Sequence, residues 1–501
     1  MSKKNFFICL LLLLTFALKA QLPCGVVHFW DKENKLRMLE NRSAGTSALQ
    51  RTAGGPIYIP VTIHLIGNSS GIGHADPKKA VRMICKLNTD FADQNIVFYL
   101  NGQIRYINDD FLFSDSYDWS VMSGMQGYKV NNTMNIFVNA NSSQPVAGYY
   151  SPFHDFIFMQ NGYANGNSTT ITHETGHFFT LPHTFYGWED VYAPSLYGLS
   201  PSPLYVNGQE VEFFARTNCY TGGDGFCDTE ADYLSFRYSC PFNSPVLDPS
   251  GVPTQANPSY YMSYSSDQCM NNFSTEQKAA ILLDITNRNW LNLPAPTQTQ
   301  TLNTDSSRAI QPLDQSLVSL NSTNIRFEWD TTGASTAQQW LFVLERTLFG
   351  AVVEIPFQTV VLQDNFVNVP SQLLIANRDY QWSVLPSSDG YVCANVSRLF
   401  KFRTNTTTDI EEQAISSFHS FLLKNPVGSQ EDIQFSILSA TDGLYQIQLY
   451  DAVGHSIFQD EINHNGRSQN YSIRSNDLST GIYFLHIKNS FHSQVLKISF
   501  N

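Results

Sequence analysis

The stretch HETGHFFTLPH at residues 173–183 determines how the rest of the chain is interpreted. In an α-helix, residues four apart lie above one another on the same face, so His173 and His177 can direct a ring nitrogen at one metal ion. Glu174 lies close enough to act on a water molecule at that ion without binding the ion itself. A catalytic zinc site takes three protein ligands and leaves one position for water. We therefore expect His183 to be the third ligand.

The pattern HExxHxxxxxH resembles that of the metzincin metallopeptidases, which carry HExxHxxGxxH. In that family the glycine ends the helix and lets the chain turn towards the third histidine. Thr180 stands at this position here, and a β-branched residue tolerates positive φ poorly. Pro182 offers another way out of the helix, because proline cannot continue it. A downstream carboxylate such as Glu189 is the alternative third ligand.

The composition and the N-terminal residues indicate an exported protein. Lys+Arg 30 against Asp+Glu 43 gives a net charge of −13, which argues against nucleic acid or an anionic membrane surface as a partner. Two lysines precede the apolar run Phe6–Leu14, and Ala20 is a small residue before a cleavage point, so residues 1–20 are typical of a signal peptide. No later segment has the length and apolar character of a membrane span. We expect a secreted monomer without a transmembrane anchor.

Four of the eight cysteines follow the histidine motif closely, and they are Cys219, Cys227, Cys240 and Cys269. In an oxidising compartment such a cluster indicates disulfides rather than free thiols. Their spacing does not suggest a second zinc site.

Residues 21–54 are polar and poorly periodic, and we interpret them as a pro-segment. Residues 55–292 follow the order strand, helix, strands and then the histidine-bearing helix. The first strand is IYIPVTIHLIG from Ile57, and the first helix spans residues 78–93 with its apolar side chains on one face. This order predicts an α/β (α+β) catalytic domain whose zinc-site helix packs on a mixed sheet.

Beyond the histidine motif the chain resembles the pappalysin family, also called cytophagalysins. GGDGFCDTEADY at 222–233 looks like that family's GDxxxDTP segment, although Glu230 stands where the family usually has proline. YYMSYSSDQCMNNFSTEQ at 260–277 is similar to its Met-turn and the residues that follow. An insert at about 187–215 departs from the family.

This resemblance implies roles for further residues. Met262 would lie beneath the zinc ion, and the Tyr264 hydroxyl would stabilise the oxyanion of the tetrahedral intermediate. Asp224 and Asp228 would bind Ca²⁺, in addition to the one catalytic Zn²⁺. Two disulfides are expected, Cys240–Cys269 beside the Met-turn and Cys219–Cys227 around a small loop.

Two all-β sandwich domains are expected after the catalytic domain. Residues 293–304 are a Pro/Thr/Gln-rich linker, and the short alternating strands of 305–406 resemble a fibronectin type III module. Residues 418–501 contain KNPVGS, LYDAVGHSI and LSTGIYFLHI in the order of the type IX secretion C-terminal sorting domain. The resemblance implies a sorting signal that the type IX secretion machinery recognises.

Two residues suggest specificity and regulation. Asp267 lies where pappalysin relatives that favour arginine have an aspartate, which implies a preference for arginine after the scissile bond. The alternative is that Asp267 only caps a turn and does not contact the substrate. Cys24-Gly25 resembles the cysteine-glycine switch of metzincin pro-segments, in which a thiolate occupies the fourth zinc position. The alternatives for Cys24 are a disulfide to Cys85 or Cys393, or a thiol without a role.

Together these features predict a secreted zinc endopeptidase acting on polypeptides, with Glu174 as the general base. The alternative from another class is a surface adhesion protein with an inactive peptidase domain, which Thr180 favours. A hydrolase of non-peptide substrates has no motif beyond HExxH in its support.

Overall fold

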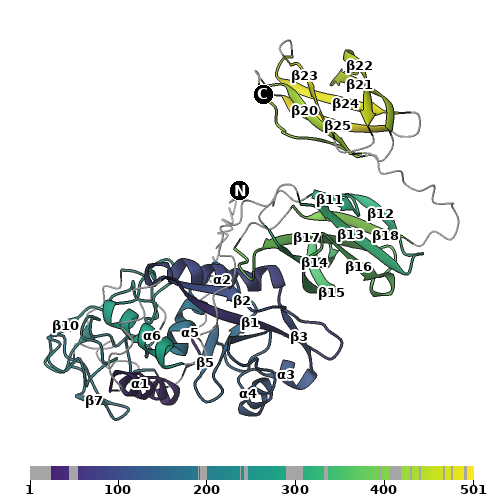
Figure 1. Ribbon diagram of the computed structural model, residues 1–501. Helices are drawn as coiled ribbons and strands as arrows, with labels where there is room; N and C mark the ends of the chain where they lie inside the picture. Colours follow the sequence, from purple (N-terminus) through teal and green to yellow (C-terminus); the bar gives the residue numbers. More distant parts are fainter. Residues whose placement is uncertain are drawn as a thin grey trace, which may run out of the picture. The chain divides into compact units, whose positions relative to one another are not determined.

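A six-stranded sheet supports the first part of the chain, in the order β2-β1-β4-β6-β5, with β3 pairing to the end of β1 (Figure 1). Its strands are β1 (Ile57–Gly67), β2 (Ile96–Leu100), β3 (Arg105–Asn108), β4 (Met134–Asn139), β5 (Gly148–Ser151) and β6 (Phe156–Gln160). The described pairings are parallel except that of β5 with β6, and β5 forms one edge. Most of β1 is buried on both faces, as its nearly continuous apolar sequence requires.

Helices cover both faces of this sheet. α2 (Pro77–Asp90) and α5 (Thr170–Phe178) share a core with one face, whereas α3 (Asp110–Ser114) and α4 (Trp119–Gln126) share a core with the other. Asp76 is the N-cap of α2, because its carboxylate accepts a hydrogen bond from the Lys78 backbone N–H in the first turn. The helix expected over 78–93 ends earlier, because a 3₁₀ turn, η2 (Ala92–Gln94), replaces its last residues.

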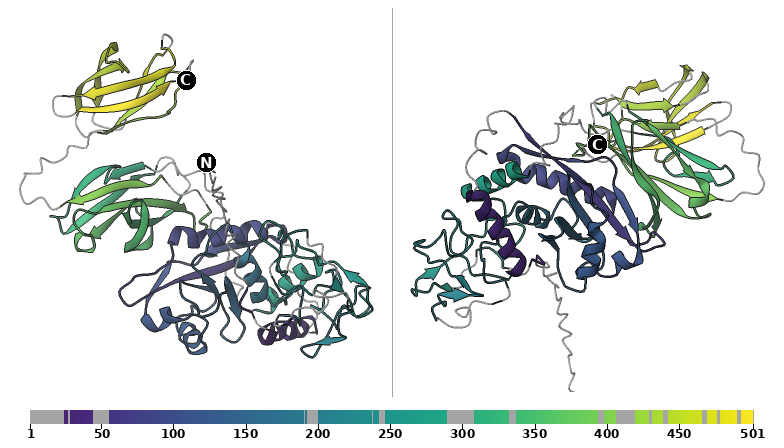
Figure 2. Two further views of the ribbon diagram at one scale, coloured as in Figure 1. Left: turned by 180° about the vertical axis from the view of Figure 1, so that it is seen from behind. Right: turned by 60° about the horizontal axis from the view of Figure 1, so that its bottom comes forward.

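The rest of residues 55–292 has less regular structure. It contains the short strands β7 (Tyr205–Val206), β8 (Gln209–Glu210), β9 (Val246–Leu247) and β10 (Pro253–Thr254), followed by α6 (Thr275–Asn287). Residues 21–54, which we expect to be a pro-segment, contain helix α1 (His28–Ser43), which packs against α6 (Figure 2).

Two further sheets follow. One has the order β11-β13-β16 and the other β12-β18-β17-β14-β15, and between them lies a core rich in aromatic residues. The elements are β11 (Arg308–Gln311), β12 (Ser316–Ser319), β13 (Asn324–Asp330), β14 (Gln339–Leu348), β15 (Ala351–Leu362), β16 (Phe366–Pro370), η6 (Ser371–Leu373), β17 (Asp379–Ser387) and β18 (Phe400–Asn405). Each strand expected from the alternating sequence of 305–406 overlaps one of these strands.

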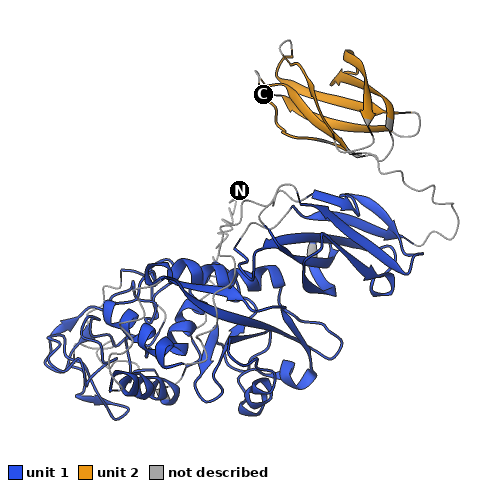
Figure 3. Cartoon of the chain, in the orientation of Figure 1, with its two compact units in different colours: residues 1–406 blue, residues 407–501 orange. Residues whose placement is uncertain are grey.

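This sandwich is continuous with the region of the six-stranded sheet rather than separate from it. The Leu100 backbone N–H donates to the Gly390 carbonyl at 2.7 Å, and Cys85 of α2 forms a disulfide with Cys393. Lys78 pairs with Glu345 at 2.7 Å, and the apolar core on one face of the six-stranded sheet includes apolar side chains of β14 and β17. Residues 1–406 accordingly form one compact unit (Figure 3).

Residues 407–501 form the second unit, which has its own apolar core. Its sheets have the orders β19-β20-β23 and β22-β21-β24-β25. The strands are β19 (His419–Leu422), β20 (Ile433–Leu438), β21 (Asp442–Asp451), β22 (Ser456–Asn465), β23 (Gln469–Ile473), β24 (Gly481–Lys488) and β25 (Ser493–Phe500).

The computed structural model describes residues 24–26, 28–43, 55–189, 191, 200–236, 238–241, 246–288, 308–331, 337–393, 398–405, 419–428, 431–438, 442–465, 469–475, 478–489 and 493–500. The expected signal peptide and the linker at 293–304 lie outside these residues. None of the helices in the described ranges is both long and apolar enough to cross a membrane.

Candidate metal centre and active site

Helix α5 carries the histidine motif and is buried along its whole length. The Nε2 atom of His177 lies 3.2 Å from Nε2 of His173 and 3.2 Å from Nε2 of His183. Two nitrogens bound tetrahedrally to zinc at about 2.1 Å are about 3.4 Å apart. The three imidazoles therefore have the chemistry and the spacing that a zinc ion requires.

After α5 the chain makes the turn that is usual with glycine at this position, although the residue here is Thr180. Thr180 has φ of 71°, the left-handed conformation, and its backbone N–H donates to the His177 carbonyl at 2.9 Å. The next backbone N–H, of Leu181, donates to the Gly176 carbonyl at 3.0 Å. The turn thus forms with threonine in the glycine position and brings His183 to the other two histidines.

The outer nitrogens of the rings have hydrogen-bond partners. Nδ1 of His177 donates to the Leu181 carbonyl at 2.8 Å, and Nδ1 of His173 donates to the Tyr261 carbonyl at 2.5 Å. Donation from Nδ1 leaves Nε2 unprotonated and able to bind a metal ion. The sequence could not reveal the Tyr261 contact, because the acceptor is a backbone carbonyl 88 residues away.

Two carboxylates lie on the outer side of His183. Oδ2 of Asp31 is 3.1 Å from Nδ1 of His183 and also accepts the His183 backbone N–H at 2.9 Å. Oε1 of Glu189 is 3.6 Å from the same Nδ1. Glu189 therefore faces the ring from the side opposite to the Nε2 cluster. The acidic and histidine groups that converge in the described residues place Glu189 with Asp31 and His183, and not with His173 and His177.

Cys24, which precedes α1, completes the group. Its Sγ and one ring nitrogen from each of the three histidines all lie within 4.8 Å of one another. Cys24 is buried and free, since Cys85 and Cys393 pair with each other, so the alternative disulfides are wrong. Burial, and then the negative charge of Glu174, raise the pKa of its thiol to about 12. A nearby metal ion would oppose this effect and favour the thiolate.

The residues around Cys24 hold it along the sheet edge. The Gly25 backbone N–H donates to the Gly148 carbonyl of β5 at 2.7 Å, in a parallel bridge. The Tyr117 hydroxyl donates to the Gly25 carbonyl at 2.6 Å. A Cβ atom on Gly25 would lie 2.9 Å from side-chain atoms of Tyr117 and Val146, so only glycine fits there.

Glu174, Tyr264 and Met262 also lie at the centre. Glu174 is fully buried on α5, next to His173. The Tyr264 hydroxyl donates to the Cys24 carbonyl at 3.1 Å, and its ring is 5.0 Å from that of His183. The Met262 thioether lies against Gly176, where a Cβ atom would be 2.3 Å from the sulfur. Glycine at 176 thus allows the methionine to pack beneath the histidine helix.

Helix α1 makes polar contacts that the sequence did not indicate. Lys35 is buried, donates to the Gly223 carbonyl at 2.6 Å, and lies 4.4 Å from the centre of the Tyr186 ring. Arg42 donates to the Gly225 carbonyl at 2.7 Å. Two buried carboxyls accompany these cations. Burial raises the pKa of Asp224 to about 7, and burial together with Asp224 raises that of Glu212 to about 9.

The two aspartates expected to bind calcium have different partners. Asp228 accepts hydrogen bonds from the Ser274 hydroxyl and the Glu276 backbone N–H, at 2.7 and 2.8 Å, and so stabilises the start of α6. Asp224 accepts hydrogen bonds from Phe226 and Thr229 within its own loop. Among the described residues, the acidic and histidine groups that converge on a common point include neither aspartate.

The remaining residues singled out in the sequence have structural partners. Asp267 accepts a hydrogen bond from the Thr169 hydroxyl at the start of α5. Disulfides join Cys219 to Cys227 and Cys240 to Cys269, as the resemblance implied.

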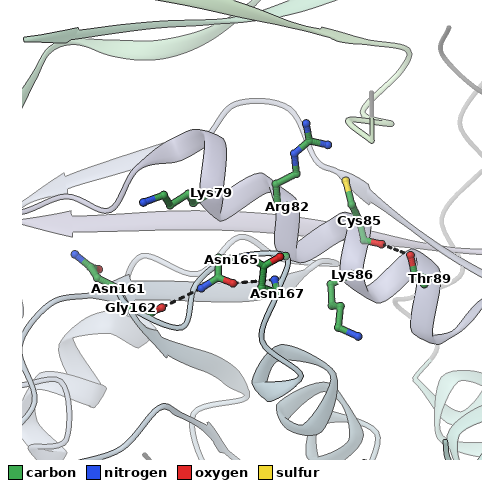
Figure 4. Close-up of a pocket in the computed structure, with 10 residues that line it drawn as sticks. Lys79, Arg82, Cys85, Lys86, Thr89, Asn161, Gly162, Asn165 and Asn167 are labelled. Carbon is green, nitrogen blue, oxygen red and sulfur yellow. Dashed lines mark hydrogen bonds between the residues drawn. The ribbon is translucent and has the colours of Figure 1, made fainter. Parts of the chain in front are cut away.

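A separate open pocket of about 880 Å³ lies between α2 and the loop at 161–167 (Figure 4). Its lining includes Lys79, Arg82 and Lys86 but none of the three histidines. The pocket is therefore distinct from the candidate metal centre.

Residues 425–501 match the family described as secretion system C-terminal sorting domain. The protein is accordingly secreted or presented at the cell surface through a type IX sorting domain.

A little under half of the chain is similar to extracellular metalloproteases of fungi. An extracellular metalloprotease of Neurospora crassa is 24% identical over 246 residues, covering 45% of this chain and 74% of the relative. One of Pyricularia oryzae is 24% identical over 258 residues, covering 48% and 78%. A solved structure of mirolysin in complex with a compound is 20% identical, covers 48% of this chain and 98% of that chain, and has a TM-score of 0.33. The two sequence matches support a secreted metalloprotease.

Proposed function

We propose that this protein is a zinc-dependent endopeptidase of the metzincin type, similar to the pappalysins, which hydrolyses extracellular polypeptides. The observation that carries the proposal is the convergence of the Nε2 atoms of His173, His177 and His183 beside Glu174 on a buried helix. The relatives named as extracellular metalloproteases support the same class of reaction.

Zinc held by the three histidines would act as a Lewis acid and lower the pKa of water at the site. Glu174 takes the proton of the attacking water and returns it to the leaving amine. Once the pro-segment has left, the Tyr264 hydroxyl is released from the Cys24 carbonyl and donates to the developing oxyanion. The Tyr261 and Leu181 carbonyls fix the ring orientations of His173 and His177.

Replacing the general base tests this assignment directly. Glu174→Gln keeps the size of the side chain but removes the proton acceptor, so peptide cleavage should fall by roughly two to four orders of magnitude. The zinc content should remain that of the wild type, because Glu174 is not among the expected ligands. Cleavage at the wild-type rate by a purified variant that contains zinc would refute the role of Glu174.

The structure weakens the case for an inactive adhesion protein. Thr180 was the feature that favoured it, because a failed turn would remove the third histidine. The turn forms, and His183 lies within 3.2 Å of His177.

We further propose that Cys24 maintains latency by occupying the position of the attacking water. Its sulfur lies with the three ring nitrogens, and Gly25 is held on β5. We expect cleavage near Arg51, which lies outside the described residues, to release the segment. In a proform lacking only residues 1–20, Cys24→Ala should become active or process itself sooner than the parent. Equal latency of the two proteins would exclude this role for the thiol.

Asp267 carries the proposed preference for arginine immediately after the scissile bond. It lies at the start of the histidine helix, where its carboxylate accepts the Thr169 hydroxyl, and a guanidinium could pair with the same carboxylate. In a peptide library, Asp267→Ala should lower the preference for arginine over apolar residues at this position. A wild-type preference for apolar residues there would remove the idea.

A further inference from the structure

Two aromatic side chains of the pro-segment lie on aromatic rings of the catalytic region. The Trp30 ring centroid is 5.9 Å from that of Tyr117 and 5.5 Å from that of Tyr149. The Phe29 ring stacks on Phe153, with centroids 5.4 Å apart and planes inclined by 16°. Aromatic pairs at such distances contribute stabilisation beyond the burial of their area.

Trp119 extends the same surface, since its ring centroid is 5.9 Å from that of Phe153. We call Tyr117, Trp119, Tyr149 and Phe153 the aromatic patch. Trp119 is 54% exposed and Phe153 is 41% exposed even with α1 in position. Large aromatic side chains so exposed contribute little to the core, and a cluster of them indicates a contact surface.

The aromatic patch adjoins the sheet edge beside the histidines. Tyr149 belongs to β5, and Phe153 follows the end of that strand. An edge strand has unpaired backbone groups with which an extended polypeptide can form hydrogen bonds. Cys24 already forms a bridge with Gly148 at the start of β5, so the pro-segment passes from the metal centre along this edge to the patch.

We propose that the aromatic patch is a substrate subsite that binds an aromatic side chain of the polypeptide, a few residues from the scissile bond. Phe29 and Trp30 occupy this subsite in the proform as stand-ins for that side chain. The inference rests on the proposed endopeptidase activity and names a feature of its substrates. Aromatic occupants are specified because the two side chains seated on the patch are phenylalanine and tryptophan.

The test uses the full chain after removal of its pro-segment and a peptide that it cleaves. Peptide pairs are made that differ only in carrying phenylalanine or alanine at one position, and each position on both sides of the scissile bond is tested in turn. At one position we expect phenylalanine to raise kcat/KM about tenfold over alanine, the scale of a favourable aromatic contact. This ratio should fall below about threefold in Trp119→Ala and in Phe153→Ala.

The matched control is Tyr205→Ala, which removes an aromatic side chain that is 64% exposed and belongs to β7. This variant should keep the wild-type ratio. Ratios that are equal in all the proteins, or the absence of any position at which phenylalanine is favoured, would overturn the inference.

Binding separates this inference from the proposed activity. The same peptide pairs are titrated against the processed Glu174→Gln variant, with and without Trp119→Ala. Tighter binding of the phenylalanine peptide that is lost with Trp119→Ala supports the subsite even if no peptide is cleaved by the wild type. Equal binding of the two peptides overturns the subsite even if cleavage is observed.

Discussion

Thr180 occupies a backbone conformation that β-branched residues seldom adopt. Its φ is 71°, its side chain is fully buried, and its hydroxyl has no hydrogen-bond partner among the described residues. The strain is tolerated because the turn satisfies two backbone N–H groups and brings His183 into the metal centre. Sequence reasoning identified this position as unusual but could not decide whether neighbouring contacts would impose the turn.

Replacing Thr180 with glycine should relieve this strain. A left-handed conformation costs a non-glycine residue about 1–2 kcal/mol, and the extra chain entropy of glycine offsets about half of that. Thr180→Gly should therefore raise the free energy of unfolding by about 0.5–1 kcal/mol. Thermal or denaturant unfolding of the catalytic unit measures the change.

Thr175→Gly is the matched control, because Thr175 is equally buried and its hydroxyl also has no hydrogen-bond partner among the described residues, but it lies within α5. Glycine there should destabilise the protein by about 1 kcal/mol or more. Destabilisation of similar size by both substitutions would show that Thr180 is not strained.

At the scale of elements, α1 shows what hydrophobic periodicity misses. Its buried residues recur at helical spacing, but most of them are polar, as in Asp31, Asn34 and Lys35. A search for apolar stripes therefore gave no helix in the pro-segment. Strand β1 and helix α2 were predictable, because β1 is a nearly continuous apolar run rich in β-branched residues and the buried apolar positions of α2 recur at helical spacing.

The contact of Lys35 with the Gly223 carbonyl should govern how firmly α1 is held. A hydrogen bond from a charged group is worth about 1.5–3 kcal/mol, and Lys35→Ala would also leave Glu212 and Asp224 without this cation. We expect the variant proform to lose its pro-segment at least about tenfold faster in limited proteolysis.

Lys32→Ala provides the comparison, since Lys32 lies on the same helix and is exposed. The Lys32→Ala proform should lose its pro-segment at the parental rate. Loss of the pro-segment at the same rate in both variants would mean that the buried lysine does not anchor α1.

At the scale of the whole molecule, the two compact units were partly foreseen. The sorting domain was recognised from the order of its motifs, and its residues match a known family. The continuity of the catalytic region with the sandwich was not foreseen, because the Cys85–Cys393 disulfide joins residues 308 positions apart. No local pattern indicates which of several separated cysteines will pair.

In the candidate site too, residues within one local motif were predictable and contacts between distant segments were not. The three histidines and Glu174 were predictable, because a helical motif fixes their spacing. The contacts of Asp31 and Tyr261 with the histidine rings were not, because they join elements far apart in the sequence. Such residues are found only when the fold brings them together.

Metal content measured together with peptide cleavage tests the central claim most directly. Secreted protein freed of its pro-segment should contain about one zinc ion per chain, as a site with three histidine ligands implies. A chelator should remove both the zinc and the cleavage of a peptide library, and added zinc should restore both. Cleavage that continues undiminished in metal-free protein, or processed protein that binds no zinc, would contradict the account.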